Sequence, residues 1–516
     1  MRKNLTIKQR KYTKKIFQDK KLKVEDHDFE LKLEEALNSY QTANYQDALE
    51  KLKYLKINKD HFIINWYLGH TYFKLSEYNL AIESIKKSIQ LNSKDTLNLN
   101  FLAELYKAIN KYDLAILSLE ESLKIDEKNK NTLINLAKIY TDKGNFKEAI
   151  KNYYLILENE PNNYGVYYEL IKLKKDYLNE SLIKKINQDL LLNNIDDENK
   201  MYANFILANN EKLNKNYKLQ INHLLKSHKI FINKKKTALH QEWNYFSNLL
   251  PKFIVKNNQN TLKILDTDEV RPIFIVGLPR SGTTLVENII SNGLMKLPMG
   301  GEIEPFSKVF YSKNIIRNYD SLSLKTNFNF KRNEYHLLKE NILYHYNQSE
   351  LINSKTKNTF TDKSLENFLY IDIIQKIFPK SKFIYCQRNP MANILGIFNN
   401  FLPNLLWTHS LETIFEFFDI YHKKLDEIKA KNNLNFKIIN IEQISNEPKK
   451  ISKDLYKFLE LEWSDDCIDL KKSNNIIKTA SNIQVREEIT KHDLDYLKNY
   501  IDIFKDFEKK YNWFKY

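Results

Sequence analysis

A repeat with a period of 34 residues runs through the first half of the chain and constrains the fold more than any other feature. Each copy combines a leucine and its small neighbour with aromatic and alanine sites. In chain order these are Leu68-Gly69, Tyr72, Tyr78, Ala81; Leu102-Ala103, Tyr106, Tyr112, Ala115; and Leu136-Ala137, Tyr140, Phe146, Ala149. Small residues suit positions where two helices touch, and aromatic residues fill the space between them. The period therefore predicts stacked helix-turn-helix units that bury their apolar faces against one another.

This pattern resembles the tetratricopeptide repeat over about residues 30–162. A less regular copy, with Ala36, Tyr45 and Ala48, precedes the three clear ones. Residues 143–145, Lys-Gly-Asn, fit the turn between the two helices of one unit, and Pro161 falls where a repeat ends. The resemblance implies an α-solenoid whose surface binds a protein or peptide. It assigns the recurring tyrosines to packing.

Four segments follow from these patterns. Residues 1–28 form a basic N-terminal segment, and residues 29–162 carry the repeats. Residues 163–266 keep a helical pattern and are interpreted as degenerate repeats or a helical connector. Near residue 267 the character of the sequence changes, and residues 267–516 are predicted to form a second domain.

The chain has 81 Lys and Arg residues against 65 Asp and Glu, with a net charge of +16. Such an excess often indicates a polyanionic partner. Lysine is abundant throughout, however, including in plain helical stretches, so a coding bias explains the excess better. We therefore expect no nucleic-acid partner.

Two cysteines, Cys386 and Cys467, argue against a disulfide-built secreted domain and against a multi-cysteine zinc site. The 11 histidines are scattered, so no metal is expected. The basic N-terminus has no apolar run behind it, and no stretch of about 18 apolar residues occurs. We expect no membrane span and a cytoplasmic location.

A strand, a glycine-bearing loop and a helix follow one another from residue 271 to residue 290. Residues 273–276 are rich in β-formers, residues 277–282 have the frame G-x-x-x-x-G, and residues 285–290 read as a helix. Five of the nine glycines lie between Gly277 and Gly301. Backbone N–H groups at such a loop and the helix dipole favour a bound phosphate. The lysine that reaches β- and γ-phosphates in nucleotide loops is replaced by Thr283, whereas Arg280 brings positive charge from within the loop.

The loop P-R-S-G-T-T closely resembles the 5'-phosphosulfate loop of sulfotransferases. With Leu285-Val286-Glu287 behind it, it is similar to the loops of tetratricopeptide-sulfotransferases and tyrosylprotein sulfotransferases. This resemblance implies the donor PAPS (3'-phosphoadenosine-5'-phosphosulfate), with PAP as its product and no metal. It also implies an α/β, P-loop-like domain with a mostly parallel sheet. The donor-binding residues implied in the loop are Pro279, Arg280, Ser281, Gly282, Thr283 and Thr284.

Further landmarks of that family follow in order. Residues 299–302 resemble its glycine-glutamate element, which makes Glu302 the implied catalytic base and Glu304 a weaker candidate. Residues 360–363 resemble its lysine element, which places Lys363 against the bridging oxygen or the sulfuryl group.

Residues 382–386 read as a second strand, and Arg388 behind it matches the arginine of the 3'-phosphate element. Residues 436–442 read as a further strand. Residues 479–486 resemble another family block, in which Ser481 contacts the donor near the reacting sulfate. The resemblance covers about residues 271–490 and implies Arg280, Glu302, Lys363 and Ser481 as the catalytic set.

Three positions depart from the family pattern. Gly396 stands where the 3'-phosphate serine is usual, and Asn393 or Asn399 is the candidate substitute for its hydroxyl. Asn389 replaces an aspartate, and Ile441 replaces a tyrosine. The changes bear on donor affinity and donor choice.

The predicted function is sulfuryl transfer from PAPS to an acceptor hydroxyl. A tyrosine of a protein or peptide is one candidate acceptor, and a carbohydrate, lipid or small alcohol stays open. Two other functions compete with this one. A repeat scaffold with a degenerate transferase domain would fit Gly396, and a P-loop phosphotransferase would fit the frame of the loop.

Overall fold

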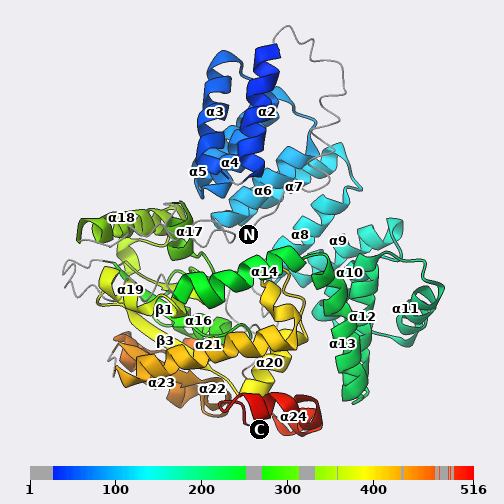
Figure 1. Ribbon diagram of the computed structural model, residues 1–516, viewed down its shortest axis with the longest axis vertical. Coiled ribbons are helices and arrows are strands. Elements are labelled where there is room, and N and C mark those ends of the chain that lie inside the picture. The colour runs from blue at the N-terminus through cyan, green and yellow to red at the C-terminus, as the bar shows by residue number, and fades with distance from the viewer. Residues whose placement is uncertain are drawn as a thin grey trace. The chain divides into compact units, whose positions relative to one another are not determined.

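A computed structural model describes residues 27–42, 44–251, 270–312, 332–356, 358–431, 435–470, 476, 486, 489 and 493–515 (Figure 1). Within it the chain divides into two compact units, residues 1–136 and residues 137–516. The first unit is built from helices. The second combines further helices with a β-sheet.

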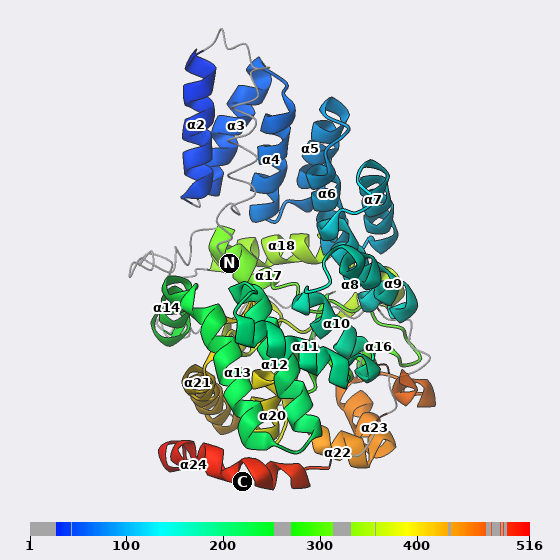
Figure 2. The same ribbon diagram turned by 90° about the vertical axis from the view of Figure 1, so that its right-hand side faces the viewer.

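The helices of the first unit follow one another as antiparallel pairs (Figure 2). They are α2 (His27–Gln41), α3 (Tyr45–Asn58), α4 (Phe62–Lys74), α5 (Tyr78–Leu91), α6 (Thr96–Ala108) and α7 (Tyr112–Ile125), and α8 (Lys130–Lys143) crosses the boundary. The small residues of the repeat lie where helices meet: Ala81 and Ala115 are fully buried. A Cβ on Gly69 would lie 2.5 Å from Cγ1 of Ile85, so a side chain there would displace Ile85. The predicted α-solenoid is confirmed.

Helices continue into the second unit. They are α9 (Phe146–Asn159), α10 (Tyr164–Leu173), α11 (Glu180–Leu192), α12 (Asp197–Leu213), α13 (Tyr217–Asn233) and α14 (Lys236–Asn244). The predicted turn at residues 143–145 separates α8 from α9, and Gly144 adopts a φ of 78° there.

The helices interpreted as a connector share a core with the α/β part. Gln220 of α13 donates to Oδ1 of Asn399 over 2.6 Å and accepts from the hydroxyl of Tyr500 over 2.6 Å. Buried His228 of α13 donates through Nε2 to the carbonyl of Phe398 over 2.8 Å. These buried bonds join segments about 170–280 residues apart and make the helices an integral part of the second unit.

A four-stranded sheet organises the α/β part, with the order β2-β1-β3-β4 and every pairing parallel. The strands are β1 (Arg271–Val276), β2 (Thr359–Asp362), β3 (Lys382–Gln387) and β4 (Phe436–Asn440). The predicted mostly parallel sheet is confirmed. The last strand is shorter than predicted and ends at Asn440 instead of Glu442. The Asn440 side chain accepts from the Gln443 N–H over 3.0 Å and so caps α22 (Ile441–Asn446).

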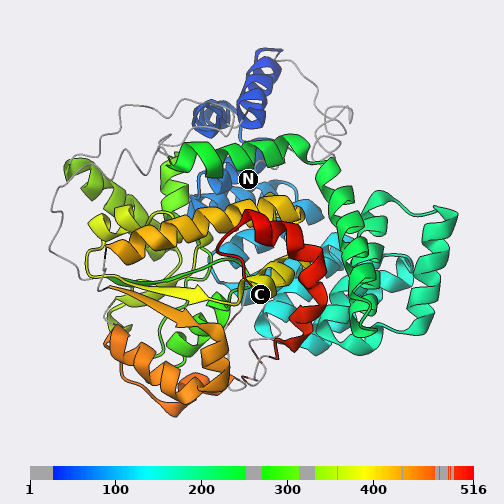
Figure 3. The same cartoon turned by 60° about the horizontal axis from the view of Figure 1, so that its bottom comes forward.

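Side chains alternate between the two faces of the sheet, and each face is covered by helices (Figure 3). Ile273 and Ile275 face a core with α16 (Thr283–Ser291), α22 and α23 (Pro448–Leu459). Phe274 and Val276 face the opposite core. Its helices include α17 (Pro305–Ser312), α18 (Arg332–Gln348), α19 (Ile371–Ile377), α20 (Pro390–Phe398), α21 (Leu411–Ala430) and α24 (Ile501–Lys510).

Parallel strands place all their carboxyl ends at one edge of the sheet, which is where open α/β sheets bind ligands. Gly277 directly follows β1, Lys363 follows β2 and Arg388 follows β3. Neighbouring strands are about 4.8 Å apart. The topology therefore gathers three of the predicted elements at one edge.

Candidate active site

The loop between β1 and α16 is a tight turn whose two end glycines cannot be replaced without strain. Gly277 has a φ of 156° and Gly282 a φ of 90°. A Cβ on Gly277 would lie 2.9 Å from the Cys386 carbonyl oxygen, and one on Gly282 would lie 2.5 Å from Cδ1 of Ile441. Thr283 and Thr284 begin α16, where N–H groups of the first turn point out of the helix. The loop has the geometry of a phosphate site.

Two arginines meet at this loop, Arg280 from the loop itself and Arg388 from the segment that follows β3. Nη1 of Arg388 donates to the Arg280 carbonyl over 2.8 Å, and Asn393 of α20 donates to the Pro279 carbonyl over 2.6 Å. Arg280 itself adopts a positive φ of 64°. Arg388 and Asn393 therefore hold the carbonyls of the turn from outside.

Gly396, the departure from the 3'-phosphate serine, lies beside both arginines. A Cβ at this position would lie 3.3 Å from Cβ of Arg280 and 3.5 Å from Nη1 of Arg388. Of the two candidate substitutes, Asn393 supports the loop, and Asn399 bonds to Leu395 and to α13. Both amide side chains therefore already form hydrogen bonds within the protein.

Positive charge accumulates at the loop. Burial and then the charge of Arg388 lower the pKa of Arg280 to about 10. Burial lowers the pKa of Lys212 in α12, and the charges of Lys175, Arg388 and Arg280 add to the effect. A cation whose pKa is lowered by neighbouring positive charge is stabilised by a bound anion.

The residues at the loop fit an anionic ligand with several acceptor oxygens. The Ser281 hydroxyl and Nε of Arg388 are buried and have no hydrogen-bond partner within the described part of the chain. Buried polar groups are normally hydrogen-bonded. Both are donors, which a phosphate or a sulfate satisfies.

A short segment before α17 pairs with the outer edge of β2 and brings Glu302 to Lys363. Thr361 donates from its N–H to Pro298 over 3.1 Å and accepts from Gly300 over 2.9 Å, and Lys363 donates to Gly301 over 2.8 Å. A Cβ on Gly300 would lie 2.2 Å from the Thr361 carbonyl oxygen, so a side chain cannot fit. Glycine at 300 is thus a condition for this pairing.

Lys363 and Glu302 form an ion pair with unequal exposure. Nζ of Lys363 lies 2.9 Å from Oε1 of Glu302, and the exposed fractions of the two side chains are 2% and 56%. Burial alone would lower the pKa of Lys363, but the negative charges of Glu302 and Glu287 outweigh it and raise the pKa. The site holds a buried ammonium next to an accessible carboxylate.

Asp362 fixes the turn that carries Lys363. Its Oδ1 accepts from the Ser364 N–H over 3.0 Å, from the Ser364 hydroxyl over 2.7 Å and from Asn367 over 2.9 Å. Its Oδ2 accepts from the Tyr346 hydroxyl over 2.7 Å. Both oxygens of the Asp362 carboxylate accept hydrogen bonds, so the backbone around Lys363 is held in place.

Glu304, the weaker candidate base, has a different environment. Desolvation by the surrounding protein and the charge of Glu366 raise its pKa to about 7. Its N–H donates to the Ser364 hydroxyl over 2.8 Å. Glu302 is the carboxylate that contacts Lys363.

The structure brings the predicted loop residues and Arg388 together at the ends of β1 and β3, and Glu302 and Lys363 together at the end of β2. Ser481 lies outside the described residues. The prediction missed the supporting roles of Glu287 and Asp362, although both stand inside quoted motifs. Among the described residues, no group of three or more His, Cys, Asp or Glu side chains could hold a metal ion.

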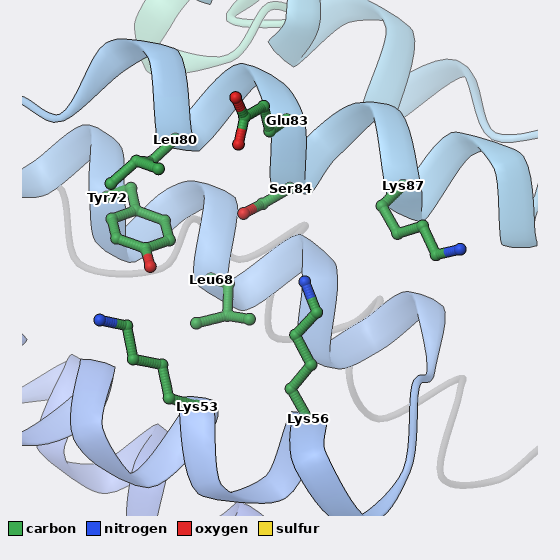
Figure 4. A pocket seen from close by; sticks show the side chains of 8 residues that line it. All are labelled: Lys53, Lys56, Leu68, Tyr72, Leu80, Glu83, Ser84 and Lys87. Carbon is green, nitrogen blue, oxygen red and sulfur yellow. The ribbon is translucent and has the colours of Figure 1, made fainter.

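A separate pocket of about 280 Å³ lies in the repeat unit between α3, α4 and α5 (Figure 4). Lys53, Lys56 and Lys87 surround it, and Leu68 and Tyr72 contribute apolar surface. Nζ of Lys53 lies 5.8 Å from the centroid of the Tyr72 ring. The pocket combines an apolar lining with three basic groups and the carboxylate of Glu83.

Comparison with known proteins identifies both parts of the chain. The Sulfotransferase family model matches residues 272–465, and the tetratricopeptide repeat model matches residues 66–95, 98–129 and 131–163. The chain thus carries tetratricopeptide repeats and a sulfotransferase family domain. The resemblance predicted from the loop is confirmed at this level. No helix in the described ranges has the length and apolar character needed to cross a membrane.

Among individual proteins, an uncharacterized protein of Aquifex aeolicus (strain VF5) is 26% identical over 246 residues. The match covers 45% of this chain and 31% of that protein, so the chain spans about a third of this curated relative. The sulfotransferase domain of the Synechococcus PCC 7002 olefin synthase is 15% identical, with a TM-score of 0.31, over 48% of this chain and 98% of that one. Sulfotransferase STF1 from Mycobacterium tuberculosis H37Rv is 11% identical, with a TM-score of 0.27, over 56% of this chain and 90% of that one.

Proposed function

We propose that the sulfotransferase family domain at residues 272–465 is an active transferase that moves a sulfuryl group from PAPS to an acceptor hydroxyl. The observation that carries the proposal is the pairing of Glu302 with Lys363 at the sheet edge that also holds the anion loop. The loop and Arg388 supply donors for a nucleotide with two phosphate groups. Glu302 supplies an accessible base.

On the donor side, the N–H groups at the start of α16 and the Ser281 hydroxyl would bind the 5'-phosphosulfate. Arg388 and Lys212 would balance the charge of the 3'-phosphate, with Gly396 beside Arg388. Arginine keeps its proton, so Arg280 acts as a charge clamp. Ser481 stays a predicted donor contact.

On the acceptor side, Glu302 would take the proton of the acceptor hydroxyl as a general base. The acceptor oxygen forms a bond to sulfur while the bond between sulfur and the 5'-phosphate oxygen breaks. The bonding electron pair stays on that phosphate oxygen, and Lys363 and Arg280 stabilise the charge that develops there. PAP and the sulfated acceptor leave.

The first prediction concerns donor binding, measured by calorimetric titration of the full chain with PAP, AMP and ATP. We expect PAP to bind much more tightly than AMP, because the 3'-phosphate meets Arg388. The variant Arg388→Met should weaken PAP binding about 10–100-fold, since a hydrogen bond to a charged group contributes about 1.5–3 kcal/mol. AMP binding should weaken much less, because AMP loses only the support that Arg388 gives to the Arg280 carbonyl.

The other outcomes of this titration support the competing functions. Failure of the wild-type chain to bind PAP would support a repeat scaffold with a degenerate domain. A preference for ATP with magnesium would support a phosphotransferase. Equal loss of PAP and AMP binding in Arg388→Met would remove Arg388 from the 3'-phosphate site.

For the acceptor, we propose a hydroxyl on a polypeptide, with tyrosine as the first candidate. The loop with Leu285-Val286-Glu287 supports this class through its resemblance to tyrosylprotein sulfotransferases. Tetratricopeptide repeats offer a surface suited to polypeptides. The pocket of Figure 4 would bind a side chain of such a polypeptide.

The second prediction is that labelled sulfate from PAPS is transferred to tyrosine-containing peptides in preference to matched peptides with phenylalanine. Serine peptides, sugars and simple alcohols serve as competing acceptors in the same assay. Transfer to sugars or alcohols alone would replace the polypeptide acceptor. It would leave the sulfotransferase activity itself in place.

A further inference from the structure

Glu287 is a fully buried carboxylate on the helix that begins at the anion loop. It lies four residues after Thr283, the first residue of α16, and its exposed fraction is 1%. A buried, ionised carboxylate is costly unless charges and hydrogen bonds compensate it. The hydrogen bonds and charges that compensate Glu287 therefore indicate its role.

Both hydrogen bonds of Glu287 reach the elements that carry the proposed catalytic pair. Its Oε1 accepts from the Gly301 N–H over 3.0 Å and from the Thr361 hydroxyl over 2.9 Å. Gly301 precedes Glu302 in the chain, and Thr361 lies two residues before Lys363. One oxygen atom thus ties the loop helix to the segment of Glu302 and to β2.

Glu287 is also a counter-charge for Lys363 that does not depend on Glu302. Burial raises the pKa of Glu287, and the charge of Lys363 is the largest effect that opposes this rise. Other titratable groups around Lys363 include Asp362 and Cys386. When Glu302 takes a proton from the acceptor, it loses its charge, and Glu287 still faces the ammonium.

We propose that Glu287 is a positioning residue for sulfuryl transfer, which fixes Glu302 and Lys363 relative to the anion loop and keeps Lys363 charged while Glu302 acts as the base. This inference rests on the proposed function. The buried carboxylate thus has a geometric role, which is to hold the two residues in place, and an electrostatic role, which is to keep Lys363 charged. Substitutions can remove the charge and the hydrogen bonds separately.

The variant Glu287→Gln separates them, because a glutamine oxygen can accept both hydrogen bonds but carries no charge. The matched control Thr361→Val removes one of the two hydrogen bonds and leaves the charge. The assay is hydrolysis of PAPS to PAP and sulfate by the full chain, with water as the acceptor, followed across pH. Binding of PAP and the melting temperature are measured for each variant.

For Glu287→Gln we expect PAP affinity within about threefold of wild type and a turnover up to about 10²-fold lower, because the hydrogen bonds are kept but the Lys363 ammonium, which stabilises developing charge, loses a counter-charge when Glu302 is protonated. The alkaline limb, which is the fall of turnover at high pH in the pH profile, should also move to lower pH. Turnover falls as pH rises because the cations of the site lose their protons. Arg280, whose pKa is about 10, contributes to this fall in every variant. Lys363, whose pKa in the wild type lies above the usual 10.5, contributes the part that depends on Glu287. Without the charge of Glu287 the pKa of Lys363 falls.

In Thr361→Val the alkaline limb should stay where it is in the wild type, because the charge remains. Unchanged turnover and an unchanged alkaline limb in Glu287→Gln, with PAP still bound, would overturn the positioning role and leave the sulfotransferase proposal standing. Absence of PAP binding and hydrolysis in the wild-type chain would instead overturn the sulfotransferase proposal. A low melting temperature with a wild-type alkaline limb would reduce Glu287 to a structural residue.

Discussion

Replacing Glu302 by glutamine is expected to lower the rate of sulfuryl transfer by about 10²–10⁴-fold and to leave the affinity for PAP unchanged. A glutamine has the size of the glutamate but cannot take the acceptor proton. The exposed fraction of the Glu302 side chain is 56%, so the change leaves no buried cavity. Initial rates with labelled PAPS and a calorimetric titration with PAP measure the two quantities.

Glu304→Gln is the matched control for this prediction, because Glu304 lies two residues away and has no described contact with Lys363. Its substitution should change the rate by less than about tenfold, below the range of general-base effects. Near-normal turnover in Glu302→Gln would remove Glu302 as the base. A large loss confined to Glu304→Gln would transfer the role to Glu304, whose pKa of about 7 suits proton transfer.

Replacing Lys363 by methionine is expected to lower turnover by about 10²–10³-fold, the cost of losing one preorganised group that stabilises developing charge. Methionine approximates the length of the lysine stem, so the packing of this buried side chain is largely kept. The loss of charge also leaves Glu287 buried without its principal cation. Breaking a buried pair from one side costs about 3–5 kcal/mol, which thermal denaturation detects.

The double variant Glu287→Gln with Lys363→Met separates the two losses. Removal of both charges should restore most of the stability, because no buried charge is left uncompensated. Turnover should stay low, since the cation is still absent. Recovery of turnover together with stability would show that Lys363 supports the fold and takes no part in the reaction.

The sequence by itself determined the repeats, the anion loop and the types of residue at the site. The repeat could be recognised because each unit packs only on its neighbours, so the packing residues recur at a fixed spacing in the sequence. The loop could be recognised because a strand, two glycines and the start of a helix are contiguous in the sequence. Gly277 and Gly282 adopt positive φ angles that other residues rarely adopt, so few residues could replace them.

Only the tertiary structure decided which of these residues meet and what holds them. Lys363 and Glu302 are 61 positions apart, and Thr361 and Glu287 are 74 apart. Their contacts depend on the strand order β2-β1-β3-β4 and on Gly300 pairing with the edge of β2. A motif specifies which residue stands at a position, but hydrogen bonds between distant segments exist only after the parallel sheet has aligned its carboxyl ends. The buried counter-charge of Glu287 and the bonds of α13 to the α/β part were therefore absent from the sequence patterns.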